Sequence, residues 1–209
     1  NYQVSFRDGD TDRVATAFDL HPAEGRAGKG LNYRTNLYFA ETRDAGVSWT
    51  NAAGEKLVLP LRAAANPALV RDYRREDLSV YLKDIAFTAA GEPVILYLTS
   101  KGFNPGAASG PFQWHTARWD GRAWVFRASV TSDHNYDHGS FYIEADGRWR
   151  IVAPTDPGPQ PWGTGGEMVM WTSRDAGLTW ERARQLTKGS RYNHTYARKP
   201  VGAHADFYA

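Results

Sequence analysis

Short apolar and aromatic segments alternate along the chain with turns rich in Gly, Pro and Asp. Residues 2–7 and 13–20 alternate apolar and polar positions around a tight turn at 8–10, which is typical of two half-buried antiparallel strands. Residues 36–40 and 167–171 are short, apolar and aromatic, and each runs directly into a further turn. The pattern therefore predicts an all-β chain made of many short strands.

The expected strands fall into cycles of four, joined by tight turns and by longer loops. The first cycle ends with a strand at 49–61, and a loop at 62–79 separates it from the second. We divide the chain, as one partial domain over 1–209, into units at about 1–61, 80–131 and 138–187, with the start of a fourth at 193–209. Further strands are expected at 80–88, 93–99, 112–119, 139–145, 149–153, 168–172 and 180–186.

One eight-residue turn occurs twice and marks the repeat. The copies read Thr42-Arg43-Asp44-Ala45-Gly46-Val47-Ser48-Trp49 and Ser173-Arg174-Asp175-Ala176-Gly177-Leu178-Thr179-Trp180. A Ser or Thr hydroxyl and an Asp carboxylate two residues apart can cap a tight turn, Gly supplies a backbone conformation that other residues resist, and Trp begins the next strand in the core. Residues 120–124 keep the Asp, the Gly and the Trp, and they look like a degenerate third copy.

The repeated pattern, Ser/Thr-x-Asp-x-Gly-x-Ser/Thr-Trp, resembles the Asp-box, or BNR repeat, of sialidase-like β-propellers. The resemblance implies an all-β fold of four-stranded blades, here three to four blades of a seven-bladed ring. Three blades cannot close a ring, so we expect the chain to be a fragment of a longer protein. The alternative is that both turns are hairpins of another all-β fold, such as a sandwich.

Composition narrows the classes of partner. The 25 basic and 23 acidic residues give a net charge of +2 without a basic block, so neither nucleic acid nor a membrane surface is an expected partner. Cysteine is absent, which excludes disulfides and thiolate metal sites within this sequence. The longest apolar run, around 94–98, is too short to span a bilayer, so membrane insertion is not expected. No signal peptide opens the chain, which begins and ends as if within strands.

Blade geometry sorts the polar residues onto two faces. In a four-strand meander, the tight turns lie on one face, while the long loops and the connections between blades lie on the other, where function usually sits. Four of the six histidines are expected to converge on this loop face. Candidate site residues there are Arg34, His115, His134, Asn135, Tyr136, His138, Trp162, Tyr192, Asn193, His194, Tyr196 and Arg198.

Each candidate also has a structural interpretation. His115 lies in an expected strand and is compatible with a core histidine. The 132–139 segment is compatible with an ordered loop whose Asp and Asn side chains cap its own backbone. A metal site from His134 and His138 has no supporting spacing pattern. Arg198 is compatible with a solvated side chain, and His204 is expected on the opposite face.

A wider resemblance covers the chain from about residue 33 onward. It is carried by Arg34-Thr35-Asn36-Leu37-Tyr38, Trp114-His115-Thr116-Ala117-Arg118-Trp119, Asp133-His134-Asn135-Tyr136-Asp137-His138-Gly139-Ser140, Gly165-Gly166-Glu167-Met168 and Tyr192-Asn193-His194-Thr195-Tyr196-Ala197-Arg198. These motifs resemble those of propeller polysaccharide lyases, including the ulvan lyases.

The resemblance implies an acidic, uronate-containing polysaccharide as substrate and a secreted or periplasmic enzyme. It implies that His115 and His134 are the paired histidines, that Arg198 is the carboxylate partner, and that Tyr192 or Tyr196 is the tyrosine. The other candidates, Arg34, Asn135, Tyr136, His138, Trp162, Asn193 and His194, are then expected to bind substrate. Some of these lyases hold a structural zinc; a structural zinc or calcium is therefore possible here, and the sequence requires neither.

These residue types suit β-elimination at a uronate. An Arg can neutralise the carboxylate so that the C5 proton becomes acidic, a neutral His can accept that proton, and a Tyr hydroxyl can protonate the departing oxygen. A sialidase-like glycoside hydrolase is the second hypothesis. The third is a non-catalytic propeller that binds glycans through Trp114, Trp162 and Tyr136, and a purely structural propeller is the fourth.

Overall fold

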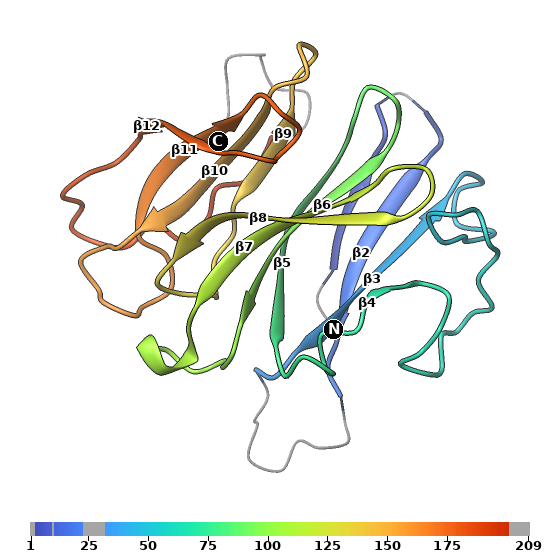
Figure 1. The fold of residues 1–209 in the computed structure, drawn as a ribbon, viewed down its shortest axis with the longest axis horizontal. Helices are drawn as coiled ribbons and strands as arrows, with labels where there is room; N and C mark the ends of the chain where they lie inside the picture. The colour runs from blue at the N-terminus through green and yellow to red at the C-terminus, as the bar shows by residue number, and fades with distance from the viewer. Residues whose placement is uncertain (1–2, 10, 23–31, 201–209) are drawn as a thin grey trace.

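The computed structural model describes residues 3–9, 11–22 and 32–200, which form three four-stranded antiparallel sheets (Figure 1). The first sheet contains β1 (Gln3–Arg7), β2 (Val14–Leu20), β3 (Thr35–Thr42) and β4 (Leu69–Arg71). The second contains β5 (Ser79–Phe87), β6 (Pro93–Ser100), β7 (Phe112–Trp119) and β8 (Trp124–Ser132), with the short 3-10 helix η1 (Ala107–Ser109) before β7. The third contains β9 (Ser140–Ile143), β10 (Trp149–Asp156), β11 (Glu167–Ser173) and β12 (Glu181–Gln185).

Each sheet is a meander, because its strands pair in the order in which they occur along the chain. The second sheet lies between the other two, and its first strand, β5, contacts both β1 and β9 (Figure 1). The two larger buried apolar clusters accordingly lie between the first and second sheets and between the second and third, and two smaller clusters lie on the other face of the first and of the third sheet. The predicted all-β fold of successive four-stranded units is confirmed, and the strands do not form the two stacked layers of a sandwich.

The two repeated turns have the same hydrogen bonds. The Asp44 carboxylate accepts bonds from the Ser48 backbone NH at 2.9 Å and from its hydroxyl at 2.6 Å, while Thr42 Oγ1 accepts from Gly46 NH at 2.9 Å. In the second copy, Asp175, Thr179, Ser173 and Gly177 repeat these contacts at the same distances. The predicted capping of the turn by a hydroxyl and a carboxylate is therefore confirmed.

The expected strand at 49–61 is wrong. After the first repeated turn, only Thr50 and Lys56 form isolated bridges, and the chain then reverses because the Asn51 side chain accepts hydrogen bonds from the NH groups of Ala53 and Glu55. The outer position of the first sheet is taken instead by β4, which pairs with β3 and lies inside the segment expected to be a loop.

The start of a fourth unit at 193–209 is described only as far as residue 200. In that part, His194 bridges Gly166 and Tyr196 bridges His138, so the segment is tied to the third sheet and to the loop before it. His204, expected on the opposite face, lies outside the described residues.

Candidate functional site

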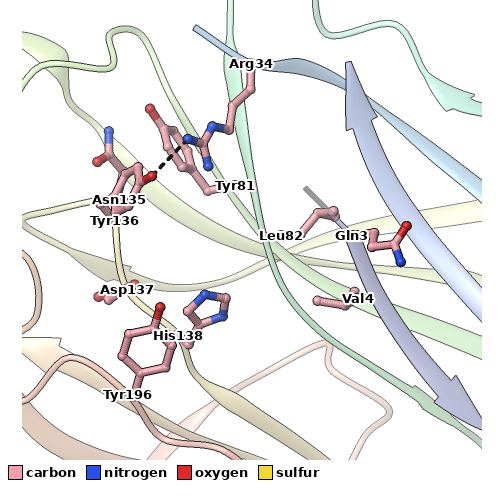
Figure 2. Close-up of a pocket in the computed structure, with 10 residues that line it drawn as sticks. All are labelled: Gln3, Val4, Arg34, Tyr81, Leu82, Asn135, Tyr136, Asp137, His138 and Tyr196. Atoms are coloured by element: carbon pink, nitrogen blue, oxygen red, sulfur yellow. Dashed lines mark hydrogen bonds between the residues drawn. The ribbon is translucent and has the colours of Figure 1, made fainter. Parts of the chain in front are cut away.

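A cavity of about 230 Å³ lies where β1, β5 and the loop between β8 and β9 approach one another (Figure 2). Its lining residues are Gln3, Val4, Arg34, Tyr81, Leu82, Asn135, Tyr136, Asp137, His138 and Tyr196. Five of the predicted site residues are thereby brought together from three separate parts of the chain: Arg34, Asn135, Tyr136, His138 and Tyr196.

Arg34 supplies a buried positive charge at one side of the cavity. It lies in the connection before β3, and its backbone carbonyl accepts a hydrogen bond from Val80 NH at 3.0 Å. Its guanidinium lies 5.0 Å from the ring centre of Tyr81 and 4.9 Å from that of Tyr136, and Nη2 donates to the Tyr136 hydroxyl at 3.4 Å (Figure 2). Two aromatic rings therefore fix the plane of the guanidinium while its charge remains next to the cavity.

His138 and Tyr196 form the opposite side of the cavity. Their rings stack at 4.6 Å, and the backbone of His138 exchanges hydrogen bonds with Thr195 and Ala197. Burial, followed by the charges of Lys83 and Arg198, lowers the pKa of His138 to about 4. The imidazole is therefore neutral near neutral pH and can accept a proton.

The loop from Asp133 to His138 is held by a buried network of charges. Lys83 Nζ lies 2.6 Å from the Asp137 carboxylate, which is also paired with His134. Burial would lower the pKa of His134, but hydrogen bonds to Asp133, at 2.5 Å, and to Asp137 raise it to about 9. Burial would raise the pKa of Asp137, but Lys83 and His134 hold it below its ordinary value. His134 is thus a buried cation near neutral pH.

A second cavity of about 370 Å³ adjoins the first and shares Asn135 and Tyr136 with it. Phe103, Phe112 and Trp162 give it an aromatic wall, and His134 lies at its edge. Trp162 has a positive φ of 61°, a conformation that a bulky residue rarely adopts.

His115 is not brought to either cavity. On β7, Trp114 packs in the cluster between the second and third sheets, whereas His115 stacks on Tyr97, a member of the cluster between the first and second. Lys83, which holds the His134 loop, lies 4.8 Å from the Trp114 ring, so His134 and His115 are on opposite faces of the second sheet. Burial lowers the pKa of His115 to about 4, and Nε2 is 2.9 Å from Thr99 Oγ1. Trp114 and His115 are adjacent on β7, so their side chains lie on opposite faces of the second sheet. His115 and His134 therefore do not form the predicted pair.

The remaining candidates lie around these cavities without lining the first. Asn193 stabilises the loop after β10 through hydrogen bonds with Gln160, Thr164 and Gly165. His194 Nε2 is 2.9 Å from Ser190 Oγ, which in turn donates to Glu167. Tyr192 is exposed beneath Arg191, and Arg198 is exposed and acts on His138 and Asp84 through its charge.

Sequence reasoning did not select Tyr81, Lys83 or Asp137. Lys83 and Asp84 interrupt an otherwise apolar strand segment, Val80 to Ala86, and charged residues in such a segment are a signal that could have found Lys83. Asp137 was recognised as part of its loop, but its two cationic partners depend on the tertiary fold. In the described part of the chain, no group of three or more His, Cys, Asp and Glu side chains is placed to hold a metal ion.

Three successive four-stranded meanders, with the cavities among their long connections, define a β-propeller architecture. The chain belongs to the BNR repeat-containing family, whose model matches residues 7–132, more than half of its length. No helix among the described residues has the length and hydropathy needed to cross a membrane.

Its relatives include carbohydrate-active enzymes. The chain is 30% identical over 123 residues to an ulvan lyase, PL25, of Pseudoalteromonas sp. (strain PLSV), a match that covers 56% of this chain and 25% of that protein. A solved PL25 ulvan lyase superposes with a TM-score of 0.63 at 22% identity, over 89% of this chain and 42% of that one, and a second structure of similar score is bound to -[GlcA(1-4)Rha3S]-. The polysaccharide lyase Uly1 gives 0.55 at 12% identity, over 93% and 39%.

The solved structures share the fold with this chain, and at these identities the likeness shows the fold alone. The chain spans about a quarter of the curated relative and about two fifths of the solved lyases.

Proposed function

We propose that this chain is part of a polysaccharide lyase that cleaves a uronate-containing acidic polysaccharide by β-elimination. The observation that carries the proposal is the first cavity, where a stacked guanidinium faces a neutral imidazole that itself stacks on a tyrosine. The likeness to an ulvan lyase over 56% of the chain supports it. Because an intact polysaccharide does not cross a cell membrane freely, we infer that the enzyme is secreted or periplasmic.

Each group in the cavity has one role in this reaction. Arg34 offsets the charge of the uronate carboxylate and so stabilises the anion that develops when C5 loses its proton. His138 accepts that proton because its lowered pKa, about 4, keeps it neutral. As the C4–O4 bond breaks and a C4=C5 double bond forms, the Tyr196 hydroxyl protonates the departing oxygen. His138 then releases its proton to the solvent, and Tyr196 takes up a proton from the solvent, which restores both groups.

This assignment revises the roles implied by resemblance. His134 is a cation near neutral pH, so it does not serve as the base; its charge instead helps to hold the loop. His115 faces another interface and has no role in the proposed reaction. Of the two candidate tyrosines, Tyr196 lines the cavity and Tyr192 does not.

The test uses the full-length protein that contains this chain and a panel of polysaccharides with rhamnose linked to glucuronate or iduronate. Product is followed by the ultraviolet absorbance of the unsaturated uronate and, in parallel, by reducing ends. His138→Gln and Tyr196→Phe should each lower kcat about 100- to 10,000-fold, as expected for loss of a proton-transfer group. Tyr192→Phe, a matched change outside the cavity, should leave kcat within about twofold of the parent.

Two other results would contradict the proposal. Absence of both signals across the whole panel would remove the lyase assignment. New reducing ends without the ultraviolet signal would favour the sialidase-like hydrolase, although Asp137, the only carboxylate among the described residues that line the first cavity, is already paired with Lys83 and His134.

A glycan-binding role is the second candidate, because several aromatic side chains near the cavities are exposed. Tyr136 and Trp162 are 41% and 42% exposed, and Tyr196 is 64% exposed. Such rings can stack on sugar faces without any chemistry. Binding of the same oligosaccharides that survives His138→Gln, with no turnover by the parent, would select this role.

A further inference from the structure

Lys83 is a fully buried cation in the middle of β5. Its side chain is 0% exposed and lies 4.8 Å from the Trp114 ring. Nζ makes three hydrogen bonds: to the Asn135 carbonyl at 2.9 Å, to the Asp137 carbonyl at 2.8 Å and to the Asp137 carboxylate at 2.6 Å. All three partners are acceptors and a neutral amine has only two N–H bonds, so the geometry requires the ammonium form. Burial lowers the pKa of Lys83, and Asp137 acts in the opposite direction.

These bonds attach the loop between β8 and β9 to the central sheet. Two of the acceptors are backbone carbonyls on either side of Tyr136, so the position of that residue on the cavity wall depends on Lys83. The network has two cations, Lys83 and His134, and two carboxylates, Asp133 and Asp137. Their charges balance within the group.

His138 follows Asp137 directly and is close enough to Lys83 to respond to its charge. Among the described residues, the charged and titratable groups that face His138 are Lys83 from β5, Asp137 from its own loop, Arg198 and Tyr196 from the segment after β12, and Arg34 across the cavity. The charges of Lys83 and Arg198 oppose protonation of His138, whereas the charge of Asp137 and, to a smaller extent, a hydrogen bond to the Lys83 backbone favour it. Because Arg198 is exposed and Lys83 is buried, the charge of Lys83 is the less screened of the two.

We propose that Lys83 is a positioning residue of this site, whose buried ammonium holds the 133–138 loop in place and keeps the neighbouring His138 imidazole uncharged. Its importance for catalysis rests on the proposed function, in which His138 accepts a proton. Lys83 itself does not touch the substrate. It acts through Tyr136, which it places, and through His138, whose protonation it opposes.

The experiment measures the titration of His138 directly, by NMR of the labelled imidazole in the full-length protein. The resonance is assigned by its loss in His138→Gln. In Lys83→Met, which removes the charge and keeps a similar side-chain length, the pKa of His138 should rise from about 4 toward the ordinary value of about 6.5, by the part of the lowering that Lys83 rather than burial causes. Lys101→Met, an exposed lysine changed in the same way, should leave it as in the parent. An unchanged His138 titration in folded Lys83→Met would overturn the proposal.

Asp137→Asn provides a second measurement if Lys83→Met does not fold. It keeps the shape of the side chain and both carbonyl acceptors while removing the carboxylate that pairs with Lys83. Amide hydrogen exchange within 133–138 should then become at least tenfold faster than in the parent, with exchange in β6 unchanged. Equal exchange rates in 133–138 would show that the network does not hold the loop.

The lyase assay separates this proposal from the proposed function. If the parent is a lyase, the acidic limb of kcat/KM against pH, which reports the protonation of His138, should move to higher pH in Lys83→Met by the same amount as the His138 pKa measured by NMR. If the parent has no lyase activity but the His138 titration moves as expected, the positioning role stands and the proposed function fails. If the parent is active but the His138 titration does not move, the proposed function stands and the positioning role fails.

Discussion

The buried charge of His134 allows a quantitative check on the network that holds the loop. Its pKa in the folded protein is about 9, because hydrogen bonds to Asp133 and Asp137 outweigh the opposing effect of burial. The difference from the ordinary value of about 6.5 is about 2.5, which corresponds to about 3 kcal/mol at about 1.36 kcal/mol per pKa unit. The side chain is only 3% exposed, so solvent screening removes little of this energy.

The sign follows from the direction of the pKa change. Folding raises the pKa, so the stabilisation is fully present below about pH 6.5 and is lost as the pH rises through about 9. His134→Gln has no such titration. The free energy of unfolding of the parent minus that of the variant should therefore be about 3 kcal/mol smaller at about pH 10 than at about pH 6.

Urea denaturation of parent and variant, followed by tryptophan fluorescence at matched pH values, measures this difference, and the comparison cancels the titration of groups common to both. His115→Gln is the control. Burial lowers the pKa of His115 to about 4, so its pH-dependent contribution is lost as the pH falls from about 6.5 to about 4 and is constant above about pH 7. A His134 difference that stays constant or grows between about pH 6 and about pH 10 would refute the charge network described here.

Two further predictions concern the repeated turns and the second cavity. Gly46→Ala and Gly177→Ala both place a side chain at a positive φ, of 88° and 81°, which costs about 1 kcal/mol of stability. Only at Gly177 would the new Cβ also meet the Trp149 ring, at 2.8 Å, so Gly177→Ala should lower the free energy of unfolding by about 1 to 3 kcal/mol more than Gly46→Ala. Thermal or urea unfolding measures the difference, and equal losses would contradict the packing described. If the second cavity binds a neighbouring sugar, Trp162→Ala should weaken binding of long uronate oligosaccharides by about 1 kcal/mol, or roughly fivefold. Binding of a disaccharide should be unchanged, and calorimetric titration measures both.

Much of the fold could be predicted from sequence because the signals are local. The alternation of apolar and polar residues marked the strands, and the repeated turn supplied its own hydroxyl, carboxylate and glycine, so that both copies form the same bonds. The strand at 49–61 was misplaced although the signal for the reversal is local, since the Asn51 side chain accepts hydrogen bonds from the NH groups of Ala53 and Glu55. The pairing of β4 with β3, in contrast, depends on contacts between separate segments.

The candidate site was predicted in part. Arg34, Tyr136, His138 and Tyr196 were recognised as members of one face because blade geometry groups the long connections. Which of them carries a given role depends on burial and on neighbours that are distant in sequence. His115 and His134 both looked suitable, yet one is a neutral histidine between two sheets and the other a cation between two carboxylates.

The sequence by itself determined the all-β repeat, the capped turns and the set of polar residues on the long connections, because each is set by residues that are close together along the chain. Only the tertiary structure decided which face of the second sheet each histidine occupies, which carboxylates pair with Lys83 and His134, and therefore which imidazole is neutral. Charges interact through space, and burial strengthens the interaction between them, so the protonation state of a side chain in the site depends on the assembled sheets.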